Sequence, residues 1–237
     1  MALLADPGAW VAFATLLLLE IVLGIDNVIF ISILAGKLPE AERKRARTTG
    51  LGLALITRVA LLASLSFLVG LTTPLFTFRG HEVSGRDLVL IAGGLFLMAK
   101  STLEIHQKVE GEEGERTKTG KRVSFVSIIA QILLLDVVFS LDSVITAVGM
   151  VDNLPIMIAA VLTATIIMMF ASGIIAGFVE RHPTVKMLAL SFLLLIGLTL
   201  IVEGFDRHIP KGYVYVAMAF SMFVETLNIR MRKRRQA

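Results

Sequence analysis

Long runs of apolar residues alternate with short polar segments along this chain. An α-helix needs roughly 20 apolar residues to cross the hydrocarbon core of a bilayer, and the runs approach or exceed that length. Charged residues are sparse inside the runs and gather between them. The pattern predicts seven membrane-spanning helices, at about residues 10–34, 49–69, 88–104, 123–150, 155–178, 185–202 and 213–229.

Composition narrows the class of protein. Apolar residues make up 56% of the chain and charged residues 18%, which is typical of a helical membrane protein rather than a soluble domain. The absence of Cys excludes disulfides, thiolate metal ligands and a thiol redox relay. The net charge of +4 does not indicate nucleic-acid binding, because the basic residues lie at predicted helix ends. We therefore predict an all-α, polytopic membrane protein that contacts lipid and binds no nucleic acid.

The distribution of Lys and Arg predicts the orientation in the membrane. Most of the 23 basic residues fall in the segment from Lys37 to Arg47, in the polar stretch before residue 123, after the fifth predicted helix and in the C-terminal tail. Cytoplasmic segments are enriched in Lys and Arg, so we expect the N-terminus outside and the C-terminus in the cytoplasm. Ala12-Phe13-Ala14 resembles a cleavage tripeptide but lies inside the apolar run, which predicts an uncleaved first helix.

A polar motif occurs twice inside the apolar runs, 116 residues apart. Each copy sets two carboxylates six residues apart and follows the second with another polar side chain. These residues are Glu20, Asp26 and Asn27 in the first copy and Asp136, Asp142 and Ser143 in the second. The pairs Leu38-Pro39 and Leu154-Pro155 keep the same offset, which indicates an internal repeat.

The repeat and the orientation together predict an inverted architecture, because the first helix enters the membrane from outside and the fourth enters from the cytoplasm. We expect two three-helix halves, residues 9–104 and 123–203. A cytoplasmic linker at 105–122 joins them and a seventh helix at 212–229 follows, within a single membrane domain of 237 residues. Inverted repeats with a polar site near the bilayer midplane recur in secondary transporters.

Buried carboxylates of this kind favour a cation site, since an unpaired charge at mid-bilayer costs several kcal/mol. On a regular helix, six residues correspond to about 120° of rotation and roughly 9 Å of rise. We therefore expect the helices to be interrupted around residues 24–27 and 140–143, so that all four carboxylates meet. Such an all-oxygen site suits Mn²⁺, Mg²⁺ or Ca²⁺. The four His residues lie outside the apolar runs, which argues against Zn²⁺ and Cu²⁺.

The first motif reads Glu20-Ile21-Val22-Leu23-Gly24-Ile25-Asp26-Asn27, the second reads Asp136-Val137-Val138-Phe139-Ser140-Leu141-Asp142-Ser143, and Arg58 lies inside the second apolar run. In these features, from the first helix through the sixth, the chain resembles the TerC family of integral membrane proteins. The resemblance implies a seven-helix bacterial inner-membrane protein of the superfamily that includes lysine exporters, with several manganese exporters among its members. It also implies metal-site roles for Glu20, Asp26, Asn27, Asp136 and Asp142, with Ser143 at the position equivalent to Asn27.

The sequence allows three other interpretations of the repeated carboxylates. The carboxylates can form a structural ion pair with Arg58 or Lys100, and Arg58 is expected to neutralise one carboxylate and fix the second helix. An intramembrane aspartyl protease also needs two facing carboxyls, but its Gly-Xaa-Gly-Asp signature precedes neither motif. A membrane-protein assembly or stress factor without transport would not require buried carboxylates in both halves.

The sequence thus favours a secondary exporter of a hard divalent cation, with Mn²⁺ as the expected substrate and Ca²⁺ or Mg²⁺ as alternatives. We expect alternating access and neither enzymatic activity nor a bound cofactor. Four ionised carboxylates in an empty site would repel one another, so some are expected to hold protons that the metal displaces. Transport is therefore expected to be coupled to protons, and the sequence indicates no oligomeric state.

Overall fold

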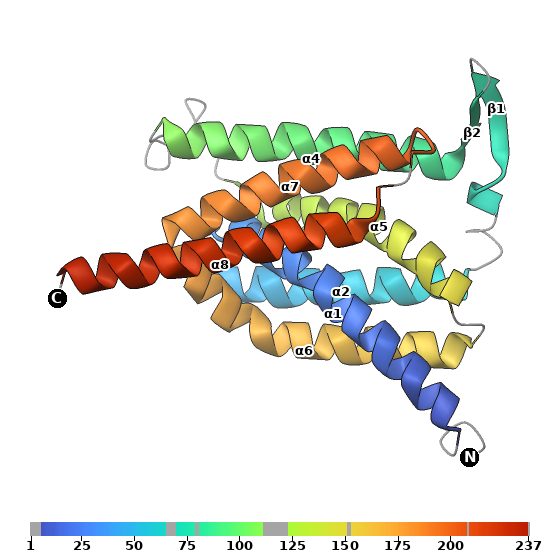
Figure 1. The fold of residues 1–237 in the computed structure, drawn as a ribbon, viewed down its shortest axis with the longest axis horizontal. Helices are drawn as coiled ribbons and strands as arrows, with labels where there is room; N and C mark the ends of the chain where they lie inside the picture. The colour runs from blue at the N-terminus through green and yellow to red at the C-terminus, as the bar shows by residue number, and fades with distance from the viewer. Residues whose placement is uncertain are drawn as a thin grey trace. The chain divides into compact units, whose positions relative to one another are not determined.

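The computed structural model describes residues 6–64, 70–78, 81–110, 123–150, 153–207 and 209–236. Over these residues the chain forms seven helices and one two-stranded hairpin (Figure 1). The helices are α1 (Pro7–Ala35), α2 (Glu40–Ala63), α4 (Gly85–Val109), α5 (Phe125–Met150), α6 (Leu154–Arg181), α7 (Pro183–Glu203) and α8 (Lys211–Gln236). The strands are β1 (Pro74–Phe78) and β2 (His81–Ser84).

Six helices among the described residues are long and apolar enough to cross a membrane. They are α1, α2, α4, α6, α7 and the segment Gly212–Arg232 of α8. Helix α5 contributes a further apolar stretch, Phe125–Leu141, within its 26 residues. The predicted all-α, polytopic membrane fold is confirmed.

Two helices extend well beyond their apolar windows. Helix α2 begins at Glu40, so Arg43 and Arg47 are helical, although the sequence predicted a loop there. Glu40 and Glu42 occupy the first turn of α2, where negative charge interacts favourably with the helix dipole. Helix α8 likewise continues through the basic tail. Hydropathy marks the part of a helix that lies in lipid, whereas backbone hydrogen bonding continues into the polar flanks.

The polar connection before α4 is a short hairpin rather than the predicted loop. Strands β1 and β2 pair antiparallel, with Thr77 opposite Glu82 and Phe76 opposite Val83. The strand β1 is rich in β-branched and aromatic residues, which favour extended backbone. The register shifts between Pro74 and Phe76, as expected beside a residue that cannot donate a backbone hydrogen bond.

The described helices fall into two compact units. One contains α1, α2, the hairpin, α5 and α6 as far as Phe178, and the other contains α4 from Asp87 together with α7 and α8. Each unit therefore draws helices from both predicted halves of the chain. The division into compact units does not test the symmetry between the two halves. The inverted repeat therefore stays a prediction.

Within the first unit, close helix contacts occur where side chains are small. A Cβ atom added to Gly24 of α1 would lie 2.3 Å from Sδ of Met168 on α6, and one added to Gly50 of α2 would lie 3.1 Å from the side chain of Ile132 on α5. Helix α1 continues without interruption past Gly24 to Ala35. The prediction of a broken first helix is therefore wrong, because Gly24 serves close packing against Met168.

Helix α5 is also continuous from Phe125 to Met150, so the interruption predicted around residues 140–143 is wrong as well. Serine hydroxyls account for this without unwinding the helix. Ser143 donates to the backbone carbonyl of Ser140 at 3.2 Å. Serine in an apolar helix commonly satisfies its hydroxyl in this way, on a carbonyl of the preceding turn.

Within the second unit, α4 and α7 approach at paired glycines. A Cβ atom on Gly94 would lie 2.5 Å from the carbonyl oxygen of Gly197, and one on Gly197 would lie 2.9 Å from the carbonyl oxygen of Gly94. Small residues allow this kind of close crossing in membrane helices. Lys100 and Glu104 of α4 form an ion pair of 2.9 Å, and Glu225 of α8 accepts a hydrogen bond from Thr184 of α7.

Candidate functional site

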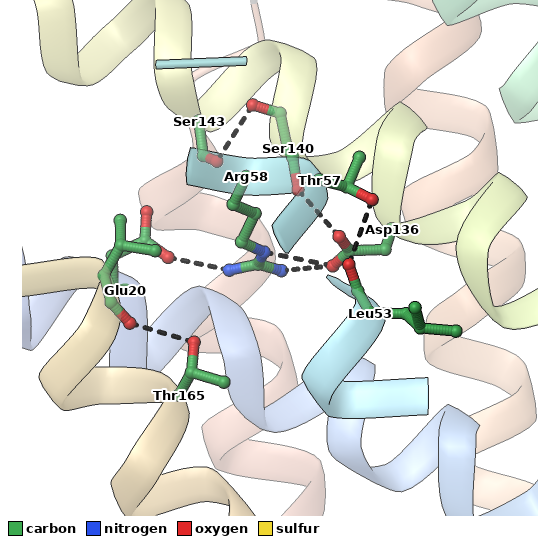
Figure 2. Close-up of polar contacts among 9 residues, drawn as sticks. Glu20, Leu53, Thr57, Arg58, Asp136, Ser140, Ser143 and Thr165 are labelled. Atoms are coloured by element: carbon green, nitrogen blue, oxygen red, sulfur yellow. Dashed lines mark hydrogen bonds and ion pairs between the residues drawn. The ribbon is translucent and has the colours of Figure 1, made fainter. Parts of the chain in front are cut away.

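Arg58 connects the two repeated motifs. Its Nη1 donates to Oε2 of Glu20 at 2.8 Å, and its Nη2 and Nε donate to Oδ1 of Asp136 at 2.6 and 3.0 Å. Figure 2 shows the guanidinium between the two carboxylates, which come from α1 and α5, while Arg58 comes from α2. We call Glu20, Arg58 and Asp136 the Arg58 triad.

The triad is buried inside the first unit. The exposed fractions of Glu20, Arg58 and Asp136 are 6%, 6% and 5%. Taking charges out of water costs several kcal/mol per ion, and only close, hydrogen-bonded partners compensate for that loss. The planar guanidinium provides such partners, because its N–H groups point in fixed directions toward both carboxylates.

Ser140 completes the surroundings of Asp136. This serine is fully buried, and its hydroxyl donates to Oδ2 of Asp136 at 3.3 Å. Asp136 thus accepts hydrogen bonds on both oxygens, and Glu20 accepts the Arg58 hydrogen bond on Oε2. Thr165 of α6 is drawn on the side of Glu20 in Figure 2, and its hydroxyl donates to the carbonyl of Val161.

The two carboxylates of the triad occupy equivalent positions in the repeat, since Glu20 and Asp136 are 116 residues apart. In Figure 1, α1 runs toward the left of the view and α5 toward the right, so the motif helices point in opposite directions. With Glu20 and Asp136 at the same level, the helix positions six residues further along each motif lie on opposite sides of the triad. Each is about 9 Å away along its helix.

Asp26 does not join Glu20 and Asp136. Among the described residues, no group of three or more His, Asp or Glu side chains is placed to hold a metal ion. The sequence predicted that all four carboxylates converge on one ion. The three whose side chains are described, Glu20, Asp26 and Asp136, do not form such a group. The physical reason is the continuous α1 helix, which keeps Asp26 about one and two-thirds turns from Glu20.

The remaining predicted residues lie at different places along the two helices. Asn27 is buried on α1 and Asp26 is half-buried beside it. Ser143 is half-buried on α5 and its hydroxyl bonds to its own helix. Asp142 belongs to α5, but its side chain lies outside the described residues.

Sequence reasoning identified Arg58 but assigned it to one carboxylate, whereas it pairs with two. The sequence contained a signal for this, because the second apolar run holds one arginine while each motif places a carboxylate at the same repeat position. Ser140 lies where the second motif helix was expected to be interrupted, and instead it donates to the side chain of Asp136 within a continuous helix. Neither contact follows from spacing within a single helix.

With both carboxyls ionised, the formal charge of the triad is −1. Two buried carboxylates that converge on one cationic group provide the oxygen donors that a hard cation prefers. The same donors hold a guanidinium in this structure. The triad is therefore a place in the bundle where a positive charge is bound deep in apolar surroundings.

The comparison with known families identifies the family of the chain. The model of the Integral membrane protein TerC family matches residues 5–237. The chain belongs to the TerC family. The match includes both carboxylate motifs and Arg58, so the resemblance predicted from those residues is confirmed.

Relatives of this TerC protein include full-length and partial matches. It is 57% identical over 234 residues to the "UPF0053 inner membrane protein YgdQ" of Escherichia coli K12, covering 98% of both chains. It is 54% identical over 230 residues to a "UPF0053 protein" of Haemophilus influenzae, covering 97% of both. The "UPF0053 protein YegH" of Escherichia coli K12 is 51% identical over 228 residues, which are 96% of this chain and 43% of that protein. No solved structure matches the chain.

Proposed function

We propose that this TerC protein is a secondary exporter of a hard divalent cation, with Mn²⁺ as its substrate. The observation that supports the proposal is the Arg58 triad. Two carboxylates at equivalent repeat positions, on two helices, converge on one positive charge in the interior of a membrane protein. Intramembrane ionisable residues in such an arrangement are typical of ion pathways.

In the proposed cycle the divalent cation replaces the guanidinium between Glu20 and Asp136. Carboxylate oxygens bind Mn²⁺ and Mg²⁺ well, whereas the absence of Cys and of membrane-core His disfavours softer metals. Asp26 and Asn27 lie further along α1 and would provide a second set of oxygen ligands on one side of the triad. Asp142 and Ser143 would do the same on the other side, as the inverted repeat predicts.

Alternating access follows from this layered order of polar groups. A cation at the level of the triad is about 9 Å from each flanking carboxylate along the helix axes. Movement of the two repeats relative to the site would expose one flank and then the other. The exporter itself needs no cofactor and performs no covalent chemistry.

The same site is expected to exchange protons for metal. Carboxyls that are empty of metal and in excess of one guanidinium repel one another, and protonation relieves the repulsion. A divalent cation displaces those protons, so its binding tightens as pH rises. Proton entry also offsets the inside-negative potential, which opposes cation export by about 2.3 kcal/mol per charge at 100 mV.

The names of the relatives support location in the bacterial inner membrane, since YgdQ of Escherichia coli is described as an inner membrane protein. We propose the same location here, with the N-terminus outside. A protease function is less well supported, because Asp136 faces an arginine and a serine rather than a second aspartate. An aspartyl dyad shares a proton between two carboxyls.

Transport by proteoliposomes tests the proposal directly. Vesicles that contain the wild-type protein should accumulate or release Mn²⁺ down an imposed gradient faster than empty vesicles. Glu20→Gln and Asp136→Asn should each reduce the flux about tenfold or more, since a contact to a charged group contributes about 1.5–3 kcal/mol. Thr57→Ala is the matched control, because the Thr57 hydroxyl donates to the carbonyl of Leu53 and not to the triad.

The second candidate role of the triad is purely structural. The close contacts of Arg58 with Glu20 and Asp136 are also consistent with an ion pair that only stabilises the fold. It predicts that a charge-free triad, Glu20→Gln with Arg58→Met and Asp136→Asn, folds and leaves metal flux at the wild-type level. The exporter proposal predicts a folded protein with no flux. Wild-type vesicles that never exceed the rate of empty ones for any of Mn²⁺, Mg²⁺ and Ca²⁺ would contradict export.

Proton coupling is tested separately in the same vesicles. Internal pH and Mn²⁺ are followed together while a pH gradient is imposed. Metal flux should accelerate when protons can move in the opposite direction, and the protons should counter-move with the metal. Flux that is indifferent to the gradient, without proton movement, would leave the metal site standing and exclude the coupling.

A further inference from the structure

We propose that Arg58 selects the substrate by its valence. Its guanidinium is a tethered monovalent cation that competes with free cations for Glu20 and Asp136. A free monovalent cation does not displace the guanidinium, whereas a divalent cation does. This inference rests on the proposed function and adds a specificity role for one residue of the same site.

The first observation is how completely the guanidinium occupies the pair. Three N–H groups of Arg58 contact the two carboxylates at 2.6–3.0 Å. The group is covalently attached to α2, so it competes at the high effective concentration of a tethered ligand. A free Na⁺ or K⁺ brings the same charge, lacks the tether and matches neither the direction nor the number of these hydrogen bonds.

Charge balance gives the second step. The two carboxylates and the guanidinium between them have a formal charge of −1. The two carboxylates with K⁺ in that position have the same charge. Replacing the guanidinium by a divalent cation makes the carboxylate pair neutral. In buried surroundings the attraction scales with the product of the charges, so each carboxylate attracts a divalent ion twice as strongly at equal distance. The stronger hydration of the divalent ion is offset only where two ionised carboxylates act together.

The third observation is that the repeat duplicates the carboxylate but not the arginine. The position equivalent to Arg58 in the second half, 116 residues later, is Ile174. Ile174 lies on α6 with 78% of its surface exposed to the surroundings of the protein. Among the described side chains, Arg58 is therefore the cation that serves both motifs. A second arginine would make the site neutral and remove the excess negative charge that attracts the substrate.

The experiment measures the half-saturating Mn²⁺ concentration for transport by purified, reconstituted protein at low and high K⁺. Ionic strength is held constant with a bulky organic cation. The wild type should give the same half-saturation at both K⁺ concentrations. Arg58→Gln should bind Mn²⁺ more tightly at low K⁺, and its half-saturating concentration should rise about tenfold or more at high K⁺.

Two further variants keep the test decisive. Arg58→Lys retains a tethered positive charge and should remain insensitive to K⁺, which separates charge from side-chain shape. Arg58→Gln combined with Glu20→Gln restores the net charge of −1 and serves if the single variant does not fold. In that double variant K⁺ should compete with Mn²⁺ for Asp136, measured as loss of Mn²⁺-induced thermal stabilisation.

The outcomes distinguish this inference from the proposed function. Wild-type transport of Mn²⁺ that K⁺ already inhibits would overturn the valence role and leave export intact. A folded Arg58→Gln or double variant that still binds Mn²⁺ but ignores K⁺ would overturn it as well. Wild-type protein that neither binds nor transports a divalent cation would contradict the proposed function itself, and the valence role with it.

Discussion

At the scale of single residues, three side chains determine the character of the site. Glu20 and Asp136 are acidic groups inside apolar helices, and each is held by the same guanidinium. Removing one member of a buried ion pair leaves an uncompensated charge, which is far more damaging than replacing all members with neutral groups of similar size. The stability of variants therefore reports on the pairing independently of transport.

Arg58→Met should destabilise the protein by about 3–5 kcal/mol, because it leaves two buried carboxylates without their partner. The charge-free triple variant with Glu20→Gln and Asp136→Asn should recover most of that loss. Unfolding in mixed detergent micelles measures both. Thr57→Ala on the same helix should change the free energy of unfolding by much less. A triple variant as unstable as Arg58→Met would contradict the pairing.

Ser140→Ala tests the support of Asp136. The Ser140 hydroxyl donates to Oδ2 of Asp136 at 3.3 Å in a fully buried position. Losing this hydrogen bond should cost about 1–3 kcal/mol of stability, since the carboxylate oxygen then lacks a donor. Ser221→Ala is a suitable comparison, because Ser221 is exposed on α8 and bonds to the carbonyl of Ala217. Equal effects of the two changes would argue against a special role for Ser140.

At the scale of helices, glycine determines how closely neighbours approach. Gly24 was expected to break α1, yet it makes room for Met168 within a continuous helix. Gly94 and Gly197 do the same for α4 and α7, where backbone faces backbone. Tertiary packing, rather than the conformational freedom of glycine, accounts for these positions.

Gly94→Ala should therefore destabilise the second unit by about 1–3 kcal/mol, because its Cβ would lie 2.5 Å from a backbone oxygen that has no room to move. Gly173→Ala is the matched control. Gly173 also lies inside a helix, but nothing lies within 4 Å of a Cβ built there, so alanine should stabilise by about 0.5–1 kcal/mol. Thermal unfolding in one detergent compares the two. Equal shifts would refute the close crossing of α4 and α7.

At the scale of the whole molecule, orientation and symmetry are the open predictions. Helices α1 and α2 belong to the same compact unit as α5 and α6, and the motif helices run in opposite directions. A two-fold rotation about an axis in the membrane plane should therefore superpose the first pair on the second, as cryo-electron microscopy in lipid nanodiscs would measure. The basic flanks of α2 and α8 predict that these ends lie in the cytoplasm.

The absence of Cys makes the orientation easy to measure. A single Cys at Asp6, before α1, should react with a membrane-impermeant maleimide added to intact cells. A single Cys at Glu113, in the predicted linker, should react only after the membrane is opened. The reverse pattern would invert the topology, and with it the direction in which the proposed export runs.

The class of fold, the approximate positions of the membrane helices and the identity of the buried charges all follow from the amino-acid sequence. Apolar runs of membrane length leave few other solutions, because every backbone polar group in lipid must be satisfied within a helix. A duplicated pair of carboxylates also stands out without structural knowledge. The motifs Glu20–Asn27 and Asp136–Ser143, together with Arg58, also predicted the family, which the family match confirms.

Which of these charges meet depends on contacts between helices and does not follow from the sequence pattern. Spacing along one helix separates Glu20 from Asp26 but says nothing about Asp136, which another helix brings to the same guanidinium. Helix ends, the β1–β2 hairpin and the role of Gly24 were likewise decided by hydrogen bonds and packing between elements. The local pattern of apolar and polar residues indicates whether a segment lies in lipid or in water. The partner of a buried charge depends on contacts between residues far apart in the chain.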